Sequence, residues 1–504
     1  MSFKRKVFTV PDNSEEIKQN ITITTKTSKL SKEEIIKQAF KFHLQGNIKE
    51  AARCYEYFIK NGFIDHRVFT NYGNIFRDLD KLTEAEQLYR KAIEINPNYA
   101  NAYSNLGTVL KDHGKLKEAE LLQRKAIEIK PDLSEPHFNL GIILKNIGKL
   151  KEAELSLEKA IEINPEFAKA YFALSSLNNN NKNNHIWKVN LFSKSILNQK
   201  SKQDKINIYF ARSNVLHNEK NYKKSAEFLK LANDIKLSLT IYKPDTLISK
   251  SNTLLLESNN EYTYHEEIDN YPESIFIVGM PRSGSTLIES ILSMNNSVYD
   301  LGEINAFEES FLEYKRNGKS IPLSKLYFEK VNYQNTNFHI TTNKLLNNYQ
   351  YVGIIIKHIP KVKIIHSFRN PLDNILSIYR AHFTRGNKYS SSLVDCAKVY
   401  LDQEEVMAKY KKRFRSEIFD LNYDLLVSNP NLKIKSLINW LGWEWEDKYL
   451  SPHLNSRSVS TASSVQVRSP IHSKSIDGWK NYKDMLKPAV EILTQSDGYR
   501  EITS

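Results

Sequence analysis

The chain of 504 residues has little cysteine and no long apolar run. Its two cysteines, Cys54 and Cys396, lie in different halves, so neither a disulfide framework nor a zinc site of paired thiolates is supported. No stretch approaches the roughly 18 consecutive apolar residues of a membrane-spanning helix. The basic residues 1–6 are also not followed by the apolar run of a secretory signal. The sequence therefore predicts no membrane association and no structural disulfide.

What the chain has in excess is positive charge. It contains 72 Lys and Arg against 58 Asp and Glu, a formal net charge of +14. An excess of this size suits a phosphate-bearing ligand or an acidic partner. Nucleic acid is the rival ligand, but no nucleic-acid-binding motif occurs and the lysines are spread over predicted helix faces, so we expect none.

The first half of the chain repeats with a period of about 34 residues. Proline, glycine, leucine and two sets of alanine recur with this spacing. The positions are Pro97, Pro131 and Pro165; Gly73, Gly107 and Gly141; Leu82, Leu116 and Leu150; Ala51, Ala85, Ala119 and Ala153; and Ala92, Ala126 and Ala160. Small residues at helix crossings and a proline at the repeat end are typical of tetratricopeptide repeats.

Each such repeat is a helical hairpin, and stacked hairpins form a solenoid with a concave surface. We predict a tail at 1–30 and an all-α solenoid over 31–240. The expected segments are four clear repeats at 31–64, 65–98, 99–132 and 133–166, a degenerate one at 167–200 with an Asn/Lys tract at 178–184, and a repeat-like pair of helices at 205–238. In this last pair, Ala211 and Ala226 occupy the positions of the small residues. A scaffold, a homodimer surface and a peptide-binding groove all remain open.

A different pattern begins after a predicted linker at 241–272. Residues 275–278 form an apolar run, 279–285 a turn of small residues, and 286–292 carry apolar residues at helical spacing. A strand, a tight turn and a helix N-terminus together favour binding of an anionic group. Gly279 and Gly284 have the spacing of a Walker P-loop, but Ser285 stands where its lysine should be, and Arg282 lies inside the turn. This substitution argues against a kinase-like ATP site, and an ordinary β–α turn is the plain alternative.

A second strand–turn–helix unit follows at 362–381. Its apolar strand, 362–365, leads to Arg369, and the Asn370–Pro371 step breaks the strand before a helix that carries Ser377. Because ligands of open α/β sheets bind at the carboxyl ends of the strands, two such units predict a ligand with two anionic groups.

These two motifs resemble those of sulfotransferases. The run Pro281-Arg-Ser-Gly-Ser-Thr-Leu287 is similar to the loop that binds the 5′-phosphosulfate, and Arg369 with Ser377 resembles the 3′-phosphate site. The resemblance covers residues 273–504 and is greatest to bacterial sulfotransferases with tetratricopeptide repeats, and it extends to tyrosylprotein sulfotransferases. It implies an α/β P-loop-like domain with a short parallel sheet, and 3′-phosphoadenosine 5′-phosphosulfate (PAPS) as co-substrate without a metal.

The resemblance also implies roles for individual residues. Glu303 stands where tyrosylprotein sulfotransferases carry the base that takes the acceptor proton, Lys344 where they stabilise the transferred group, and Ser463 beside that group. The family often has two adjacent glutamates and an Asp before the lysine, whereas this chain has one glutamate and Asn343. The implied cofactor-binding residues are Arg282, Ser283, Gly284, Ser285, Thr286, Arg369, Ser377, Tyr423, Gln466 and Arg468.

Three hypotheses about the function remain open. The first is transfer of a sulfuryl group from PAPS to an acceptor hydroxyl, with protein tyrosine or a glycan, lipid or small alcohol as acceptor. The second is a repeat adaptor with an inactive domain, and the third is a P-loop-like kinase. His358 and His366 are candidate bases by residue type, although structural roles are expected for both. Membrane-anchored relatives have an apolar segment that this sequence lacks, which suggests a bacterial cytoplasmic enzyme.

Overall fold

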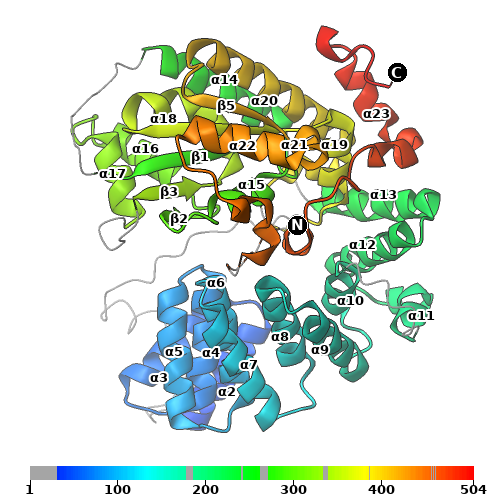
Figure 1. Cartoon of the computed structure of the whole chain (residues 1–504). Helices are drawn as coiled ribbons and strands as arrows, with labels where there is room; N and C mark the ends of the chain where they lie inside the picture. The colour runs from blue at the N-terminus through cyan, green and yellow to red at the C-terminus, as the bar shows by residue number, and fades with distance from the viewer. Residues whose placement is uncertain are drawn as a thin grey trace. The chain divides into compact units, whose positions relative to one another are not determined.

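The computed structural model describes residues 31–177, 186–239, 242–260, 271–332, 339–384, 386–455, 457, 459, 461 and 463–503. The chain forms two compact units (Figure 1). Unit 1 contains the described residues up to Leu177 together with 186–190, and unit 2 contains those from Leu191 onward. No helix in the described ranges is long and apolar enough to cross a membrane.

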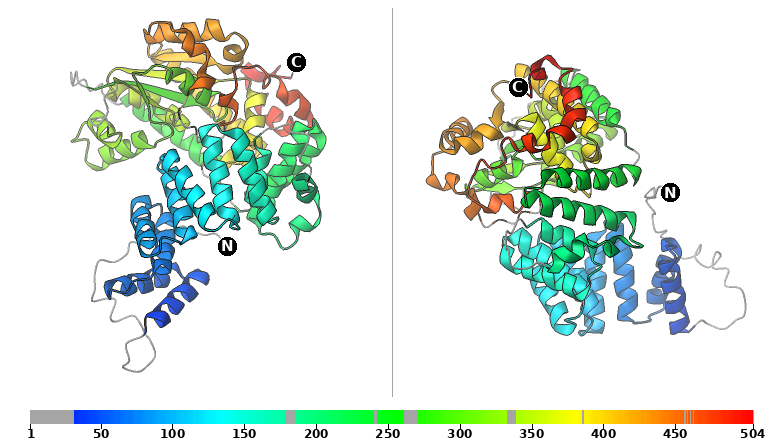
Figure 2. Two further views of the ribbon diagram at one scale, coloured as in Figure 1. Left: turned by 60° about the horizontal axis from the view of Figure 1, so that its bottom comes forward. Right: turned by 90° about the vertical axis from the view of Figure 1, so that its right-hand side faces the viewer.

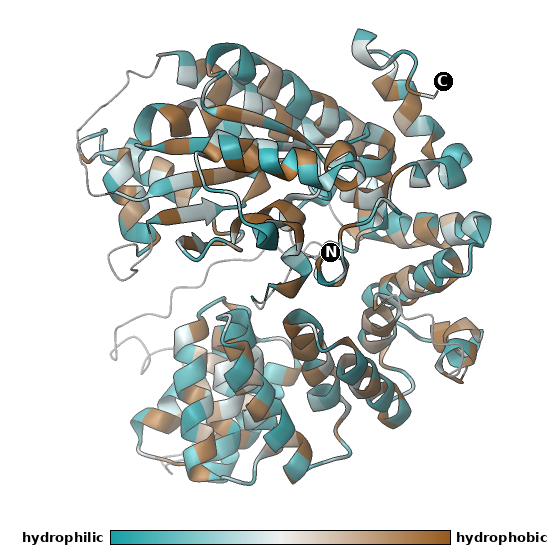
Figure 3. Ribbon diagram, in the orientation of Figure 1, coloured by the Kyte–Doolittle hydropathy of each residue, from teal (hydrophilic) through white to brown (hydrophobic). Residues whose placement is uncertain are grey.

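Unit 1 is a stack of antiparallel helical hairpins, as the 34-residue period predicts (Figures 1 and 2). Each helix carries both hydrophobic and polar residues (Figure 3). Where the hydrophobic residues recur three or four positions apart, they lie on one side of the helix and can be buried against its neighbours. The four predicted repeats each hold one pair of helices. These helices are α2 (Lys32–Leu44), α3 (Ile48–Lys60), α4 (His66–Asp78), α5 (Leu82–Ile95), α6 (Ala100–Asp112), α7 (Leu116–Ile129), α8 (Ser134–Ile147) and α9 (Leu150–Ile163), and α10 (Ala168–Ser175) follows them.

The repeated glycines allow the two helices of a hairpin to touch. A Cβ atom on Gly107 would lie 2.6 Å from the Gln123 side chain, and one on Gly141 would lie 2.7 Å from Leu157. Any larger residue would force the helices apart, which explains why a small residue recurs at each crossing.

The expected degenerate repeat differs from the others. Its first helix, α10, is short, and it is followed by α11 (Ile186–Phe192) and the 3-10 turn η1 (Ser195–Leu197). The Asn/Lys tract at 178–184 lies outside the described residues. The repeat-like pair forms α12 (Lys202–Asn218) and α13 (Tyr222–Leu239), and this hairpin belongs to unit 2 rather than to unit 1.

Unit 2 is built on five parallel strands in the order β2-β3-β1-β4-β5. The strands are β1 (Glu273–Gly279), β2 (Val298–Asp300), β3 (Ile340–Asn343), β4 (Val362–Phe368) and β5 (Ile418–Asn422). The sequence predicted this class of fold, an α/β domain with a short parallel sheet. The observed β1 and β4 are longer than the apolar runs at 275–278 and 362–365 because polar residues continue the pairing at their ends.

Side chains of the central strand point alternately into two cores. Phe276 and Val278 pack with one set of helices, and Ile275 and Ile277 pack with the other set. The first set is α14 (Pro244–Asn260), α16 (Ala306–Arg316), α17 (Leu323–Lys330), α18 (Val352–His358) and α20 (Leu393–Arg413); the second is α15 (Ser285–Leu292), α21 (Tyr423–Ser428) and α22 (Pro430–Leu441). A strand that is buried on both faces has a continuous run of apolar residues, as residues 275–278 of β1 do.

Helix α14 lies within the residues expected to form a linker. Leu254 and Leu255 join the core of unit 2, and the buried Ser251 hydroxyl donates a hydrogen bond of 2.8 Å to Asp402 on α20. Leu254 and Leu255 therefore have partners in the α/β core, whereas Leu256 is exposed. The acidic part of the predicted linker, 261–269, lies outside the described residues.

Within unit 2, a chain of hydrogen bonds joins the α12–α13 hairpin to the α/β part. Arg380, the last residue of α19 (Pro371–Arg380), lies 3.1 Å from Nε2 of His217, and Nδ1 of His217 lies 2.8 Å from the phenol oxygen of Tyr482. Tyr482, in the 3-10 turn η8 (Gly478–Tyr482), donates in turn to Ser225 on α13. Because arginine can only donate, Nε2 of His217 must be the acceptor and the ring must be neutral.

We predict that the neutral His217 ring makes unit 2 less stable in acid. Burial, and secondarily the positive charge of Arg380, lowers the pKa of His217 from 6.5 to about 3. The unfolded chain takes up this proton below about pH 6.5 and the folded chain only near pH 3. The free energy of unfolding should therefore fall between these values, by at most about 1.4 kcal/mol per pH unit from this group.

His217→Gln should weaken unit 2 at neutral pH but reduce its sensitivity to acid. Urea unfolding followed by tryptophan fluorescence measures this, because four of the five tryptophans, Trp440, Trp443, Trp445 and Trp479, lie in unit 2. The pKa of His382 is also lowered to about 3 by burial, and this residue is retained in both proteins. Equal pH slopes in the wild type and the variant would contradict the prediction.

Candidate functional site

The predicted site residues gather at the carboxyl edge of the sheet. Strand β1 ends in the turn 279–284, β3 ends next to Lys344, and β4 ends next to Arg369 (Figure 1). The two turn glycines have positive φ angles, 138° at Gly279 and 99° at Gly284. A Cβ atom on Gly279 would lie 2.2 Å from the carbonyl oxygen of Ser367, so glycine allows the ends of β1 and β4 to approach each other.

Arg282 connects the two predicted half-sites directly. Its Nε donates a hydrogen bond of 3.0 Å to Oγ of Ser377 on α19, and its Nη1 donates one of 2.5 Å to Oγ of Ser463. Arg282 itself has a φ of 68°, in the left-handed region that non-glycine residues rarely adopt. Three residues that are far apart in the sequence therefore meet around one guanidinium group.

This guanidinium group lies near other positively charged side chains. The pKa of Arg282 is lowered to about 10, first by burial and then by the neighbouring charges of Arg369 and Arg380. In the described part of the chain no carboxylate pairs with Arg282. A set of close cations with too few anions is the electrostatic condition for binding an anionic ligand.

The rest of the turn offers hydrogen-bond donors. The backbone N–H groups of Ser285 and Thr286 begin α15 and have no acceptor within the helix. The buried hydroxyl of Ser283 has no hydrogen-bond partner among the described residues. Thr286 shares a hydrogen bond of 3.2 Å with Thr461, which attaches the segment around Ser463 to this helix.

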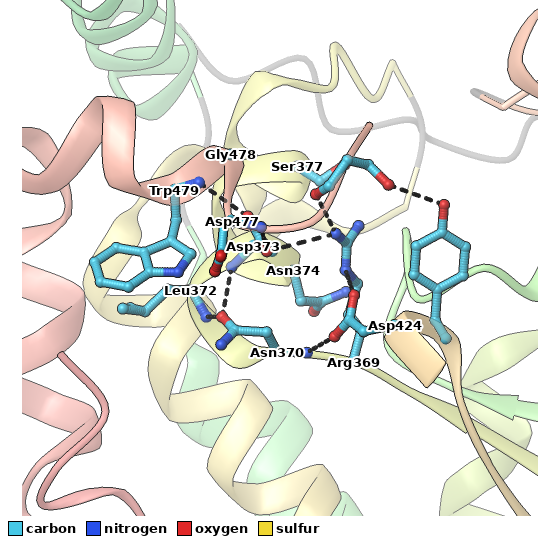
Figure 4. A network of polar contacts seen from close by, with 12 residues as sticks. Arg369, Asn370, Leu372, Asp373, Asn374, Ser377, Asp424, Asp477, Gly478 and Trp479 are labelled. Carbon is cyan, nitrogen blue, oxygen red and sulfur yellow. Dashed lines mark hydrogen bonds and ion pairs between the residues drawn. The ribbon is translucent and has the colours of Figure 1, made fainter. Parts of the chain in front are cut away.

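Arg369 is buried where β4 meets α19 (Figure 4). Its guanidinium lies over the ring of Tyr423, 4.8 Å from the centroid, and Tyr423 begins α21 directly after β5. Two carboxylates offset its charge from 3.8 Å and 3.7 Å, those of Asp373 and Asp424. Its Nη2 donates to the carbonyl oxygen of Ser475, and its Nε has no hydrogen-bond partner in the described structure.

Helix α19 is fixed to the turn 279–284 as well. The side-chain amide of Asn374 donates a hydrogen bond of 3.0 Å to the carbonyl oxygen of Pro281, and Asn370 caps the helix N-terminus. The geometry of Arg369 and Ser377 relative to the turn is therefore set by several bonds rather than by one.

Glu303 and Lys344 form an ion pair, with Nζ of Lys344 2.5 Å from Oε1 of Glu303. The pair forms because the backbone N–H of Lys344 donates to the carbonyl oxygen of Gly302, which places the two side chains together. The Lys344 side chain is 1% exposed, whereas that of Glu303 is 53% exposed. One partner is therefore fixed and the other is open to a substrate.

Glu289, which was not predicted from the sequence, also lies near Lys344, with its Oε2 3.8 Å from Nζ. Glu289 is buried on α15, and burial raises its pKa although Lys344 and Arg457 act in the opposite direction. Arg457 pairs with Glu289 at 3.0 Å and with Asp300. A glutamate within the apolar sequence of α15 was the available signal, because a carboxylate in such a position must have a partner.

The described contacts do not bring every predicted residue to this cluster. Arg468 donates hydrogen bonds to the carbonyl oxygens of Asn455 and Arg457, so it supports the segment before Ser463. Gln466 is exposed in the 3-10 turn η7 (Gln466–Arg468). Contact of Gln466 and Arg468 with a nucleotide stays a prediction.

The two histidines suggested by residue type have structural surroundings. His366 is buried on β4, with Nδ1 2.7 Å from Asp420 and Nε2 2.8 Å from the Gln403 amide. His358 is buried with its ring against Tyr314. No three His, Cys, Asp or Glu side chains in the described ranges are grouped so that they could hold a metal ion.

Comparison with known proteins divides the chain in the same way. Residues 313–447 match the sulfotransferase family, and 73–114, 100–130 and 134–167 match tetratricopeptide repeats. The sulfotransferase match includes Lys344, Arg369, Ser377 and Tyr423 and does not extend to the turn at Arg282.

Individual relatives are distant. An uncharacterized protein of Aquifex aeolicus (strain VF5) is 28% identical over 333 residues, which is 60% of this chain and 43% of that protein. The chain thus spans less than half the length of this relative. Mouse sulfotransferase 1B1 is 24% identical over 258 residues, 44% of this chain and 80% of that protein. The solved sulfotransferase domain from the curacin biosynthetic pathway is 17% identical, covers 44% of this chain and 96% of that domain, and has a TM-score of 0.34.

We predict that Gly284→Ala destabilises unit 2 by about 2–4 kcal/mol. The positive φ costs roughly 1 kcal/mol for alanine, and a Cβ atom 2.2 Å from the Tyr423 ring adds about 1–3 kcal/mol. Tyr423 cannot move away freely because Arg369 lies over its ring and its hydroxyl shares a hydrogen bond with Ser475.

Gly442→Ala is the matched control for this variant. Gly442 has a φ of 77°, but nothing lies within 4 Å of an added Cβ, so only the backbone cost of about 1 kcal/mol is expected. Urea unfolding of both variants measures the difference. Equal losses would show that the contact with Tyr423 does not constrain the turn.

Proposed function

Because the chain joins tetratricopeptide repeats to a sulfotransferase-family domain, we propose that it moves a sulfuryl group from PAPS to an acceptor hydroxyl. The observation that carries this proposal is the convergence of two anion-binding motifs. Arg282, from the turn after β1, is hydrogen-bonded to Ser377, from the helix after β4. A ligand with two separate anionic groups would bind across this junction.

The side chains present suit such a ligand. Arg282 is surrounded by like charge, Nε of Arg369 has no hydrogen-bond partner, and the Ser283 hydroxyl is buried without one among the described residues. Guanidinium groups and helix N-terminal N–H groups are strong donors to phosphate and sulfate oxygens. Arg282 and the turn would hold the 5′ end of PAPS, and Arg369 with Ser377 would hold its 3′-phosphate.

A kinase-like reaction fits less well. Ser285 occupies the position at which a Walker P-loop has lysine. Asp373 and Glu289, carboxylates of the helices that follow β4 and β1, lie beside Arg369, Lys344 and Arg457. A nucleotide that needs Mg²⁺ and a lysine would therefore lack its usual partners.

The residues around Glu303 fit transfer to a hydroxyl. When bound, PAPS supplies the sulfuryl group. Glu303, which is open to solvent, would take the proton of the acceptor hydroxyl. Lys344 is fixed by Glu289 and Glu303 and would offset negative charge that develops during transfer, with Ser463 as a further donor.

The identity of the acceptor is a further part of the proposal. Tetratricopeptide repeats form surfaces that bind peptides or proteins, which favours a protein acceptor, including protein tyrosine. A glycan, lipid or small alcohol is the alternative, and an acceptor screen with labelled PAPS would distinguish these classes. A cytoplasmic location and a homodimer remain predictions from the sequence.

We expect Arg369→Ala to weaken binding of adenosine 3′,5′-bisphosphate by about 10- to 100-fold. Charge-assisted hydrogen bonds are lost, and each contributes on the order of 1.5–3 kcal/mol. Isothermal titration calorimetry of wild type and variant measures the change, with ATP as the comparison ligand. Arg415→Ala, at an exposed arginine of the same unit, is the control for loss of charge alone.

The outcomes of this titration separate the proposed functions. Tight bisphosphate binding, weak ATP binding and loss in the Arg369 variant would support the cofactor site. No bisphosphate binding by the unchanged chain would overturn the proposed activity and favour a repeat adaptor. Mg²⁺-dependent binding and hydrolysis of ATP would favour the kinase alternative.

Glu303→Gln should lower turnover by about 10²- to 10⁴-fold, the usual contribution of a general base. Glutamine retains the size of the side chain but cannot take a proton. Bisphosphate affinity should stay near the wild-type value, because no described contact joins Glu303 to Arg282 or Arg369. Single-turnover sulfuryl transfer measures the loss of turnover, and calorimetry on the same samples measures the bisphosphate affinity. Full turnover in the variant would show that another group is the base.

A further inference from the structure

The segment 475–482 lies against the helix that begins after Arg369 (Figure 4). Its backbone is held there by one side chain of that helix, Asp373. Oδ2 of Asp373 accepts a hydrogen bond of 2.8 Å from the N–H of Asp477, and Oδ1 accepts one of 2.9 Å from the N–H of Trp479. These bonds join residues more than a hundred positions apart, so they determine where the segment lies.

The same segment contacts the residues that surround Arg369. The carbonyl oxygen of Ser475 accepts a hydrogen bond of 2.8 Å from Nη2 of Arg369. The hydroxyl of Ser475 shares one of 3.0 Å with the phenol of Tyr423, whose ring lies under the Arg369 guanidinium. The segment therefore touches two residues of the predicted 3′-phosphate site.

The carboxylate of Asp373 makes its hydrogen bonds to the segment and not to Arg369. Its carboxylate lies 3.8 Å from Arg369, close enough to offset the charge but beyond hydrogen-bond distance. Both oxygens are engaged with the backbone of the segment, so they do not occupy the donors of Arg369. Nε of Arg369 is buried without a hydrogen-bond partner in the described structure.

The backbone of the segment is shaped for this attachment. Asp477 has a φ of 61°, in the left-handed region that non-glycine residues rarely adopt. That conformation places the N–H groups of Asp477 and Trp479 on the same carboxylate. The interaction is thus a specific clamp between two backbone donors and one buried side chain.

We propose that Asp373 is a positioning residue that holds the segment 475–482 over Arg369 and so retains the bound nucleotide. It acts through Arg369 and Ser475 and takes no part in the transfer itself. This inference rests on the proposed binding of a 3′-phosphorylated nucleotide at Arg369.

The test compares two carboxylates beside the same arginine. Asp373→Asn removes the charge and at least one backbone bond to the segment. Asp424→Asn is the matched control, because Asp424 lies 3.7 Å from Arg369 but accepts its backbone bond from Asn370, outside the segment. Hydrogen exchange of peptides covering 475–482 reports the clamp, and calorimetry with adenosine 3′,5′-bisphosphate reports binding.

We expect Asp373→Asn to speed exchange in 475–482 by about tenfold or more and to weaken bisphosphate binding by about tenfold. Asp424→Asn should leave exchange in the segment at the wild-type rate. If Asp373→Asn does not fold, Asp373→Glu carries the test, because it keeps the charge but displaces both acceptors, and the same changes should appear with smaller size.

Three results would overturn the inference. Exchange unchanged in the Asp373 variant would show that the carboxylate does not hold the segment. Faster exchange with wild-type bisphosphate affinity would show that the segment does not retain the nucleotide. Equal loosening by Asp424→Asn would assign the effect to charge beside Arg369. Absence of bisphosphate binding by the unchanged chain would instead overturn the proposed function itself, while exchange would still report the clamp.

Discussion

The close approach of the turn after β1 to the helix after β4 organises the candidate site, and the hydrogen bond from Arg282 to Ser377 spans this junction. Parallel strands make it available, because their carboxyl ends meet at one edge of the sheet. Gly279 allows the two strand ends to approach, and Asn374 fixes the helix to the turn. Ser463 accepts a hydrogen bond from the same guanidinium.

Charge balance then distinguishes the two parts of the site. Around Arg369, two carboxylates stand beyond hydrogen-bond distance and offset the charge without engaging its donors. Around Lys344, carboxylates lie on both sides and one of them, Glu289, is buried. The first arrangement leaves donors of Arg369 available to an anion, and the second holds a cation in position beside an exposed carboxylate.

Much of this arrangement could be predicted from short stretches of sequence. The apolar runs before Gly279 and Arg369 indicated buried strands, and the pattern after the second run put Arg369 at the strand end and Ser377 on the helix that follows. Glu303 and Lys344 were each identified by resemblance, and the structure brings them within 2.5 Å of each other. The contact itself could not be predicted, because it depends on a backbone bond between Lys344 and Gly302 across separate segments.

Local periodicity and composition by themselves determined the helical hairpins, the two strand–turn–helix motifs and the identity of the charged residues in them. Only the tertiary structure decided that the α12–α13 hairpin belongs to unit 2, because its attachment consists of contacts between distant residues, among them the hydrogen bonds through His217 and Tyr482 and the one from Asn233 to the carbonyl oxygen of Tyr379. It likewise decided the role of Asp373, whose partners are the N–H groups of Asp477 and Trp479. Backbone donors are present at nearly every residue, so no sequence pattern marks the two that a distant carboxylate will bind.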